Sequence, residues 1–148
     1  MITYTSFNQD QDAFAIGTTK GFSIFSIEPF CFRVKRVIEG GVKVVQMVGK
    51  SNLILIVTSG LDPQYPSNHV HFWDDQRTKF VGRINAFDPD PIAISHSQSI
   101  FIVAQSNMIN CIKMGQVEVF SKIPTCENAK GIHTVSTGKD FCVATCHE

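Results

Sequence analysis

Metal binding is the first chemistry that the residue types suggest, because thiols and imidazoles gather near the end of the sequence. The candidate ligands are Cys126, His133, Cys142, Cys146 and His147. Structural zinc sites need paired ligands at short Cys-x-x-Cys spacing. Cys142 and Cys146 share one face of an expected strand, but the strand rise separates them by about 13 Å. We therefore predict buried, unreactive thiols here and no zinc site.

Two further polar pairs are candidates for chemistry. His69 and His71 point to one side of an expected strand, about 7 Å apart, and would suit a two-histidine metal site. The sequence places no third ligand beside them, so polar strand residues are the simpler interpretation. Asp74 and Asp75 face opposite sides of a strand and cannot form one acid–base pair. We interpret them as turn residues that end the strand.

Enzyme motifs are absent from the sequence. There is no Gly-x-Ser-x-Gly, no Gly-rich phosphate loop and no His-Glu-x-x-His. We therefore expect no enzyme and no cofactor.

The composition indicates a folded chain without an overall charge. Of 148 residues, 43% are hydrophobic and 18% charged, with 13 Lys+Arg balancing 13 Asp+Glu. A neutral chain has no global attraction for nucleic acid or an anionic membrane. The one basic run, Arg33, Lys35 and Arg36, alternates with valines, as on the polar face of an edge strand. We therefore expect no nucleic-acid partner.

We find no pattern of a secretory signal or a membrane span. The first residues lack a charged segment followed by a long apolar stretch, and the apolar run Leu53 to Val57 is too short to cross a bilayer. The five cysteines are spread without the spacing of a disulfide framework, which indicates reduced thiols. These features predict a cytoplasmic protein.

The elements that position these candidate residues belong to a repeat of paired apolar runs. Phe14 to Thr18 is followed, eight residues after its start, by Phe22 to Ser26. Phe101 to Gln105 is followed, at the same offset, by Ile109 to Lys113. The second run of each pair has the order apolar, polar, apolar, apolar, polar. This self-similarity indicates repeated β-hairpins.

Two further copies extend the repeat. The third consists of Ile54 to Thr58 and Val70 to Asp74, with a connection eight residues longer that is rich in turn formers. Its second run ends in a Trp-Asp pair, as many propeller blades do. The starts of the four copies are spaced by 40, 47 and 40 residues; they are Phe14, Ile54, Phe101 and Phe141.

A period of about 40–45 residues with four short strands is typical of a β-propeller blade. We predict an all-β, WD40-like β-propeller with blades at about 1–39, 40–86 and 87–125, and the start of a fourth at about 126–148. The flanking strands that complete the blades are Thr3 to Asn8, Phe32 to Ile38, Val42 to Val48, Phe80 to Ile84, Pro91 to Ser95 and Val117 to Ile123.

About three and a half blades leave sheet edges and apolar faces open. We therefore expect the chain to be the N-terminal part of one longer propeller domain; closure with another half is the alternative.

Several stretches of the chain together form a recognisable series. The most specific one runs from Pro63 to Asn68 and leads into Trp73-Asp74-Asp75. The others, in chain order, are Ser6 to Gln11, Phe14 to Gly17, Gly21-Phe22, Glu28-Pro29-Phe30, Ile38 to Val42 and Pro124 to Gly131. In this order they resemble the PROPPIN family, the phosphoinositide-binding β-propellers of autophagy that include the WIPI proteins. The resemblance implies a seven-bladed propeller, of which this sequence holds about the first half.

The resemblance also implies where phosphoinositides bind. The family binds phosphatidylinositol 3-phosphate and the 3,5-bisphosphate through an Arg-Arg-Gly motif in its later blades, where guanidinium groups match phosphate oxygens. No Arg-Arg-Gly occurs in this sequence, so none of its residues is assigned to lipid. We expect lipid binding only through the missing blades, and peripheral association of the intact protein with phagophore or endosomal membranes.

In this family the front blades contact autophagy proteins through the second blade and its groove with the third. The matching loop here contains Pro63, Gln64, Tyr65, Pro66 and Asn68, which we predict to bind a partner. A merely solvated loop is the alternative.

Many members carry an arginine-rich turn in the third blade that meets an acidic partner helix. The corresponding turn, 95–99, has no arginine, which argues against an acidic partner there.

These observations predict an autophagy scaffold that binds phosphoinositides when intact and recruits autophagy partners. Three alternatives stay open: a general WD-repeat scaffold without lipid binding, a zinc-stabilised or catalytic domain, and a non-functional truncated copy. Metal analysis and the presence of an Arg-Arg-Gly blade in a longer product distinguish them.

Overall fold

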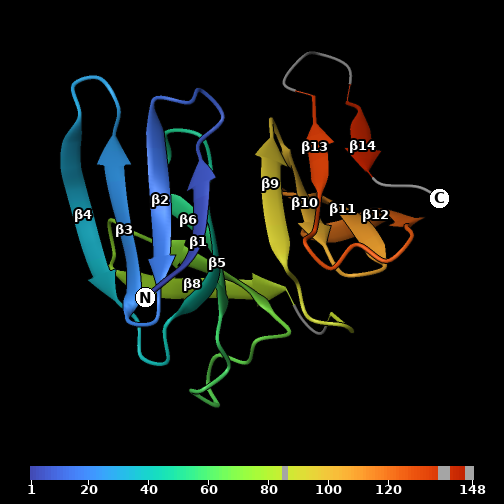
Figure 1. Cartoon of the computed structure of the whole chain (residues 1–148), viewed down its shortest axis with the longest axis horizontal. Helices are drawn as coiled ribbons and strands as arrows, with labels where there is room; N and C mark the ends of the chain where they lie inside the picture. The colour runs from blue at the N-terminus through green and yellow to red at the C-terminus, as the bar shows by residue number, and fades with distance from the viewer. Residues whose placement is uncertain (85–86, 137–140, 146–148) are drawn as a thin grey trace. The chain divides into compact units, whose positions relative to one another are not determined.

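The computed structural model describes residues 1–84, 87–136 and 141–145. These residues form strands, turns and loops without any helix, so they contain no apolar helix able to cross a membrane. The strands make three four-stranded sheets and one two-stranded sheet, all antiparallel (Figure 1). The chain divides into two compact units, residues 1–86 and 87–148. The all-β prediction is confirmed.

The first unit contains two four-stranded sheets. Sheet 1 consists of β1 (Ile2–Phe7), β2 (Ala13–Thr18), β3 (Gly21–Ser26) and β4 (Cys31–Val37). Sheet 2 consists of β5 (Val42–Met47), β6 (Leu53–Thr58), β7 (Val70–Asp74) and β8 (Lys79–Ile84). In both sheets the spatial order of the strands is their order in the sequence. The basic strand β4 is an edge strand, as the alternation of Arg33 to Val37 predicts.

The second unit contains a four-stranded and a two-stranded sheet. Sheet 3 consists of β9 (Ala93–Ser97), β10 (Ile100–Ala104), β11 (Met108–Lys113) and β12 (Glu118–Pro124), and sheet 4 of β13 (His133–Val135) and β14 (Val143–Thr145). Strand β9 begins two residues after the predicted start at Pro91, whose nitrogen cannot donate a ladder hydrogen bond. The sequence does not predict β13, because this strand has only three residues and is too short to show the apolar–polar alternation of a strand.

The predicted copies have the same hairpin register. Phe14 pairs with Phe25 and Phe101 pairs with Ile112. In the copy with the long connection, Ile54 pairs with Trp73. The eight extra residues therefore form a loop beyond the strands and do not shift the pairing.

Sheet 1 packs one face on sheet 2. Phe22 is 1% exposed and meets the ring of Trp73 edge-on, with centroids 6.0 Å apart. The buried core between the sheets also contains Ala15, Ile38, Val42, Val45, Met47, Ile54 and Ile56. The innermost strands β1 and β5 are neighbours here, since residues from both face this core.

Side-chain hydrogen bonds hold β1 on β5. The Ser6 hydroxyl donates to the carbonyl of Val45 at 2.6 Å, and the Gln46 amide donates to the carbonyl of Phe7 at 3.0 Å. Thr3 donates to the carbonyl of Val42 in the same way. Each bond joins residues 39 apart in the sequence. These bonds therefore fix β1 against β5, with each of these residues of sheet 1 bonded to the residue 39 positions later in sheet 2.

The passage from sheet 1 into sheet 2 requires glycine. Gly41 has a φ of 81°, a conformation that disfavours residues with a Cβ, and a Cβ there would lie 2.6 Å from the carbonyl oxygen of Thr19. The sharp turn is what brings β5 against β1.

Replacing Phe22 by Ala tests the packing between the sheets. Because the side chain is fully buried, we expect the free energy of unfolding to fall by about 3–5 kcal/mol. Val81→Ala on the exposed face of β8 is the control and should change it by less than about 0.5 kcal/mol. Chemical denaturation measures both, and equal effects would contradict the described core.

Candidate partner-binding site

The predicted partner loop connects β6 to β7 and projects beyond sheet 2 (the green loop of Figure 1). Pro63 and Gln64 are exposed, whereas Tyr65, Pro66 and Asn68 are half-buried. The five predicted residues therefore divide into an exposed tip and a set of anchors.

Hydrogen bonds fix the path of the loop. At the tip, the carboxylate of Asp62 accepts from the backbone N–H of Gln64 at 2.9 Å, and its carbonyl accepts from that of Tyr65 at 3.0 Å. At the base, the hydroxyl of Thr58 donates to the carbonyl of Tyr65, and His71 donates through Nε2 to the carbonyl of Pro66 at 3.2 Å. The loop therefore has a defined shape, held from the strands at both of its ends.

An aromatic cluster lies beneath the loop. The ring of Tyr65 is 4.4 Å from that of Phe80 and 5.6 Å from that of His71, and His71 is 5.4 Å from Phe80. His69 stacks on His71 at 5.9 Å, and its Nδ1 contacts the side-chain oxygen of Asn68 at 2.6 Å. The histidine pair that suggested a metal site is thus part of the loop's anchorage.

Burial changes the acid–base properties of this pair. His71 is 2% exposed, and loss of solvent lowers its pKa, with the neighbouring His69 and Arg83 acting in the same direction. The hydrogen bond to Pro66 opposes the shift. His71 is therefore neutral near pH 7 in the folded protein.

A shallow groove borders the loop tip. A cavity of about 560 Å³ is lined by Glu39 and Gly40 on one side and by Leu61, Asp62, Pro63 and Gln64 on the other. Leu61, which lines this groove, is 79% exposed. Its aliphatic side chain beside the carboxylates of Glu39 and Asp62 forms a surface suited to a protein ligand.

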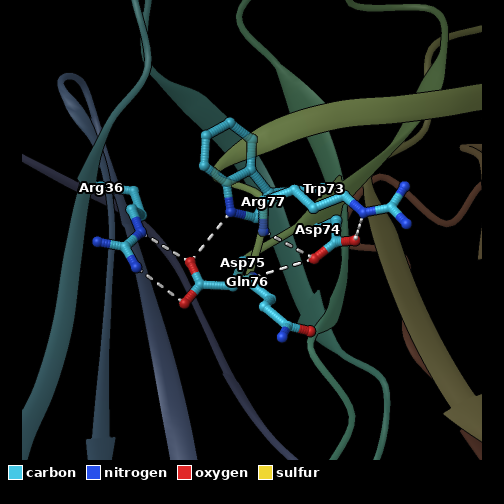
Figure 2. A network of polar contacts seen from close by, with 6 residues as sticks. All are labelled: Arg36, Trp73, Asp74, Asp75, Gln76 and Arg77. Atoms are coloured by element: carbon cyan, nitrogen blue, oxygen red, sulfur yellow. Dashed lines mark hydrogen bonds and ion pairs between the residues drawn. The ribbon is translucent and has the colours of Figure 1, made fainter.

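The opposite end of β7 carries a polar network (Figure 2). The carboxylate of Asp75 accepts two hydrogen bonds from the Arg36 guanidinium, at 2.8 and 3.0 Å, and one from the Trp73 indole at 3.1 Å. Arg36 belongs to β4 of sheet 1, so this bidentate ion pair joins the two sheets near their outer strands. The sequence interpretation of Arg36 as a solvated edge residue is therefore incomplete.

Asp74 has the role that the sequence predicts. Its carboxylate accepts from the backbone N–H groups of Gln76 and Arg77 at 3.0 and 3.1 Å, which stabilises the turn after β7 (Figure 2). Asp75 ends the strand as predicted, but its contact with Arg36 has no signal in the sequence. Only the packing of the two sheets brings residues 39 apart together.

The described residues contain no group of three or more His, Cys, Asp or Glu side chains arranged to hold a metal ion. Cys111 is buried, and burial raises the pKa of its thiol. The prediction of a buried thiol at Cys142 is wrong: this residue is exposed, because it borders a two-stranded sheet with no further described strand beside it. Cys146 and His147 lie outside the described residues.

Comparison with known proteins places the chain among relatives much longer than itself. No family model matches it. It is 30% identical to SVP1-like protein 2 of Schizosaccharomyces pombe over 72% of this chain and 32% of that protein. It is 29% identical to autophagy-related protein 18e of Arabidopsis thaliana over 95% of this chain and 38% of that protein. The chain thus spans about a third of the length of these curated relatives.

Solved structures show the same fold. Hsv2 of Kluyveromyces marxianus matches with a TM-score of 0.72 and 25% identity, over 84% of this chain and 37% of that one. KlAtg21 in complex with the coiled coil of AgAtg16 matches with a TM-score of 0.72 and 18% identity, over 97% of this chain and 46% of that one.

The chain forms successive four-stranded antiparallel sheets and matches the solved structure of Hsv2. Together these two observations place its fold in the class of β-propeller proteins. Over most of its length, the chain is related to the PROPPIN family, which the SVP1-like, Atg18-type and Hsv2 proteins represent. The predicted fold class and family are confirmed. The predicted division into blades and the predicted partner loop stay predictions.

Replacing His71 by Gln tests the anchorage of the loop through its pH dependence. The pKa of His71 is lowered by folding, so below about pH 6.5 the unfolded chain binds more protons than the folded one and stability falls. We expect the wild type to lose more stability than the variant when thermal unfolding is followed from about pH 7.5 to 5.5. Parallel profiles for the two proteins would contradict this assignment.

Replacing Asp75 by Ala tests the ion pair between the sheets. Both partners are partly exposed, at 29% and 24%, so solvent screening limits the expected loss in the free energy of unfolding to about 1–2 kcal/mol, including the lost indole hydrogen bond. Lys50→Met, which removes the exposed pair with Asp12, should leave stability unchanged. An Asp75→Ala protein as stable as wild type would show that the network adds nothing to the packing.

Proposed function

We propose that this chain is the partner-binding portion of a PROPPIN-like autophagy scaffold. The observation that carries the proposal is the similarity to an Atg18-type protein over 95% of the chain, together with the ordered, projecting loop of sheet 2. The match to KlAtg21, whose structure was solved with the AgAtg16 coiled coil, supports a protein ligand from the autophagy machinery.

The loop has the physical properties of a recognition site. Its tip exposes Leu61, Pro63 and Gln64, while Tyr65 and Pro66 hold its base on sheet 2. A loop ordered before binding loses little conformational entropy when a partner docks. The adjoining groove adds aliphatic contact area beside the two carboxylates. The loop and the groove together form the proposed docking surface.

We assign phosphoinositide binding to the part of the longer relatives that this chain does not match. Bidentate recognition of phosphate requires free guanidinium groups. In this chain Arg36 is paired with Asp75, and the sequence has no Arg-Arg pair. The intact protein would be cytoplasmic and would bind phagophore or endosomal membranes peripherally through its later blades. It would act as a scaffold and not as an enzyme.

A binding assay with the purified Atg16 coiled coil tests the proposal. We expect the chain to bind it with micromolar affinity or better, and the double variant Leu61→Ser/Gln64→Ala to weaken binding by about tenfold. Both substitutions lie on exposed side chains, so thermal stability should not change.

Val81→Ser on the exposed face of β8 is the matched control and should bind like the wild type. A wild-type chain that shows no binding, or a loop variant that binds as tightly as the control, would contradict the proposed docking surface.

A further inference from the structure

A second, smaller cavity lies between the end of β4 in sheet 1 and strands β7 and β8 of sheet 2. Its volume is about 240 Å³. Sheet 2 and its long loop contribute the rings of Tyr65, Trp73 and Phe80, and sheet 1 contributes Val37 and the connection that follows it. Val37 is 75% exposed, so this aliphatic wall is open to solvent. We call this space the seam cavity.

The two walls of the seam cavity belong to one compact unit. Sheet 1 packs on sheet 2 through Phe22 and Trp73, and the ion pair of Arg36 with Asp75 joins β4 to the end of β7. A propeller grows by adding sheets beside those already present, so no further sheet enters between these two. Additional blades would therefore not fill the seam cavity.

The size and lining of the seam cavity select the kind of group that can enter. Small-molecule sites usually have volumes of about 300–1,000 Å³, so this smaller space suits a single side chain. Most of its wall is aliphatic or aromatic, and the two charged residues that border it, Glu39 and Lys79, have opposite signs. Such a lining favours an uncharged, apolar side chain, because an ion would lose its water without gaining a net counter-charge.

The groove at the tip of the partner loop adjoins the seam cavity, because Glu39 lines both. Gly40 follows Glu39, and a Cβ on Gly40 would lie 3.1 Å from the Cβ of Leu61. The loop tip therefore lies directly against the connection that carries Glu39. One bound segment could occupy both spaces.

The groove is acidic where the seam cavity is apolar. Glu39 and Asp62 line the groove, and the described residues around it include no cationic side chain. Within the described part of the chain, neither carboxylate belongs to an ion pair. Asp62 accepts a hydrogen bond from the backbone N–H of Gln64, which positions its carboxylate at the tip. Two carboxylates without counter-ions favour a partner of positive charge.

We propose that the partner of this chain is a basic protein segment that anchors itself by one aliphatic or aromatic side chain. The apolar side chain fills the seam cavity, and Lys or Arg residues next to it pair with Glu39 and Asp62. The inference rests on the proposed function, since it uses the same docking surface, and it adds the chemistry of the ligand. A buried apolar anchor contributes affinity, and the charges around it fix the orientation.

Trp73 reports directly on the seam cavity, because it lines the cavity and is the single tryptophan of the sequence. Its indole N–H resonance is followed by NMR during titration with three short peptides. They are acetyl-Leu-Ala-Lys-Arg-amide, acetyl-Leu-Ala-Glu-Glu-amide and acetyl-Ser-Ala-Lys-Arg-amide. We expect the first peptide to shift the resonance with millimolar affinity, and the other two to bind at least about threefold more weakly.

Variants of two exposed wall residues separate the apolar contact from the charged one. Val37→Ser should weaken binding of the first peptide by about threefold or more, and Glu39→Gln should remove most of its preference over the acidic peptide. Val81→Ser and Glu118→Gln change exposed residues of the same types outside the docking surface. These matched controls should bind like the wild type, and thermal unfolding checks that all four variants are folded.

Three results would overturn the inference: no shift of the Trp73 resonance with any peptide, equal affinity for the basic and acidic peptides, or unchanged binding by Val37→Ser and Glu39→Gln.

These outcomes are separate from the test of the proposed function. If the Atg16 coiled coil binds through Leu61 and Gln64 but is unaffected by Val37→Ser and Glu39→Gln, the docking surface stands and the basic, anchored ligand is wrong. If the peptides behave as expected and the coiled coil does not bind, the ligand chemistry stands and the proposed partner is wrong.

Discussion

The packing of sheet 1 on sheet 2 is the interaction on which the rest of the first unit depends. Side chains of β1 donate hydrogen bonds to the backbone of β5, and Arg36 forms an ion pair with Asp75 near the outer strands. Each of these contacts joins residues 39 apart in the sequence. In the second unit, Ser97 bonds to the carbonyl of Ser136 across the same separation. Within each unit, the constant offset fixes one sheet against the segment that follows it, so that a repeated sequence pattern becomes a repeated architecture.

This constraint explains what could be read from the sequence and what could not. The repeat of apolar runs predicted β7 at 70–74, since its position follows from the local period. The pairing register of the hairpins came from the structure. The long loop between β6 and β7 was predicted from its turn residues, but its anchorage by His71 and the contact of Arg36 with Asp75 were not. Those contacts join segments that only sheet packing brings together, and no local pattern encodes them. Exposure of Cys142 likewise depends on which strands neighbour β14.

The proposed function depends on a connection between strands that can vary in length while the sheet itself does not change. Eight extra residues enter between β6 and β7 without disturbing the register of Ile54 with Trp73, so the sheet tolerates a projecting loop at little cost. The aromatic cluster below then gives this loop one defined shape, on which the proposed recognition depends. The tip of the proposed partner loop therefore lies apart from the buried core between sheet 1 and sheet 2.

Vesicle flotation with phosphatidylinositol 3-phosphate tests most directly the central claim, that this chain carries partner recognition without lipid recognition. The comparison is between the chain alone and a chimera in which it replaces the matching third of the Schizosaccharomyces pombe relative. We predict that the chimera floats with the vesicles and that the chain alone does not. Specific flotation of the chain alone would contradict the account and place a lipid site within it, with the exposed Arg33 and Lys35 of β4 as the first residues to replace.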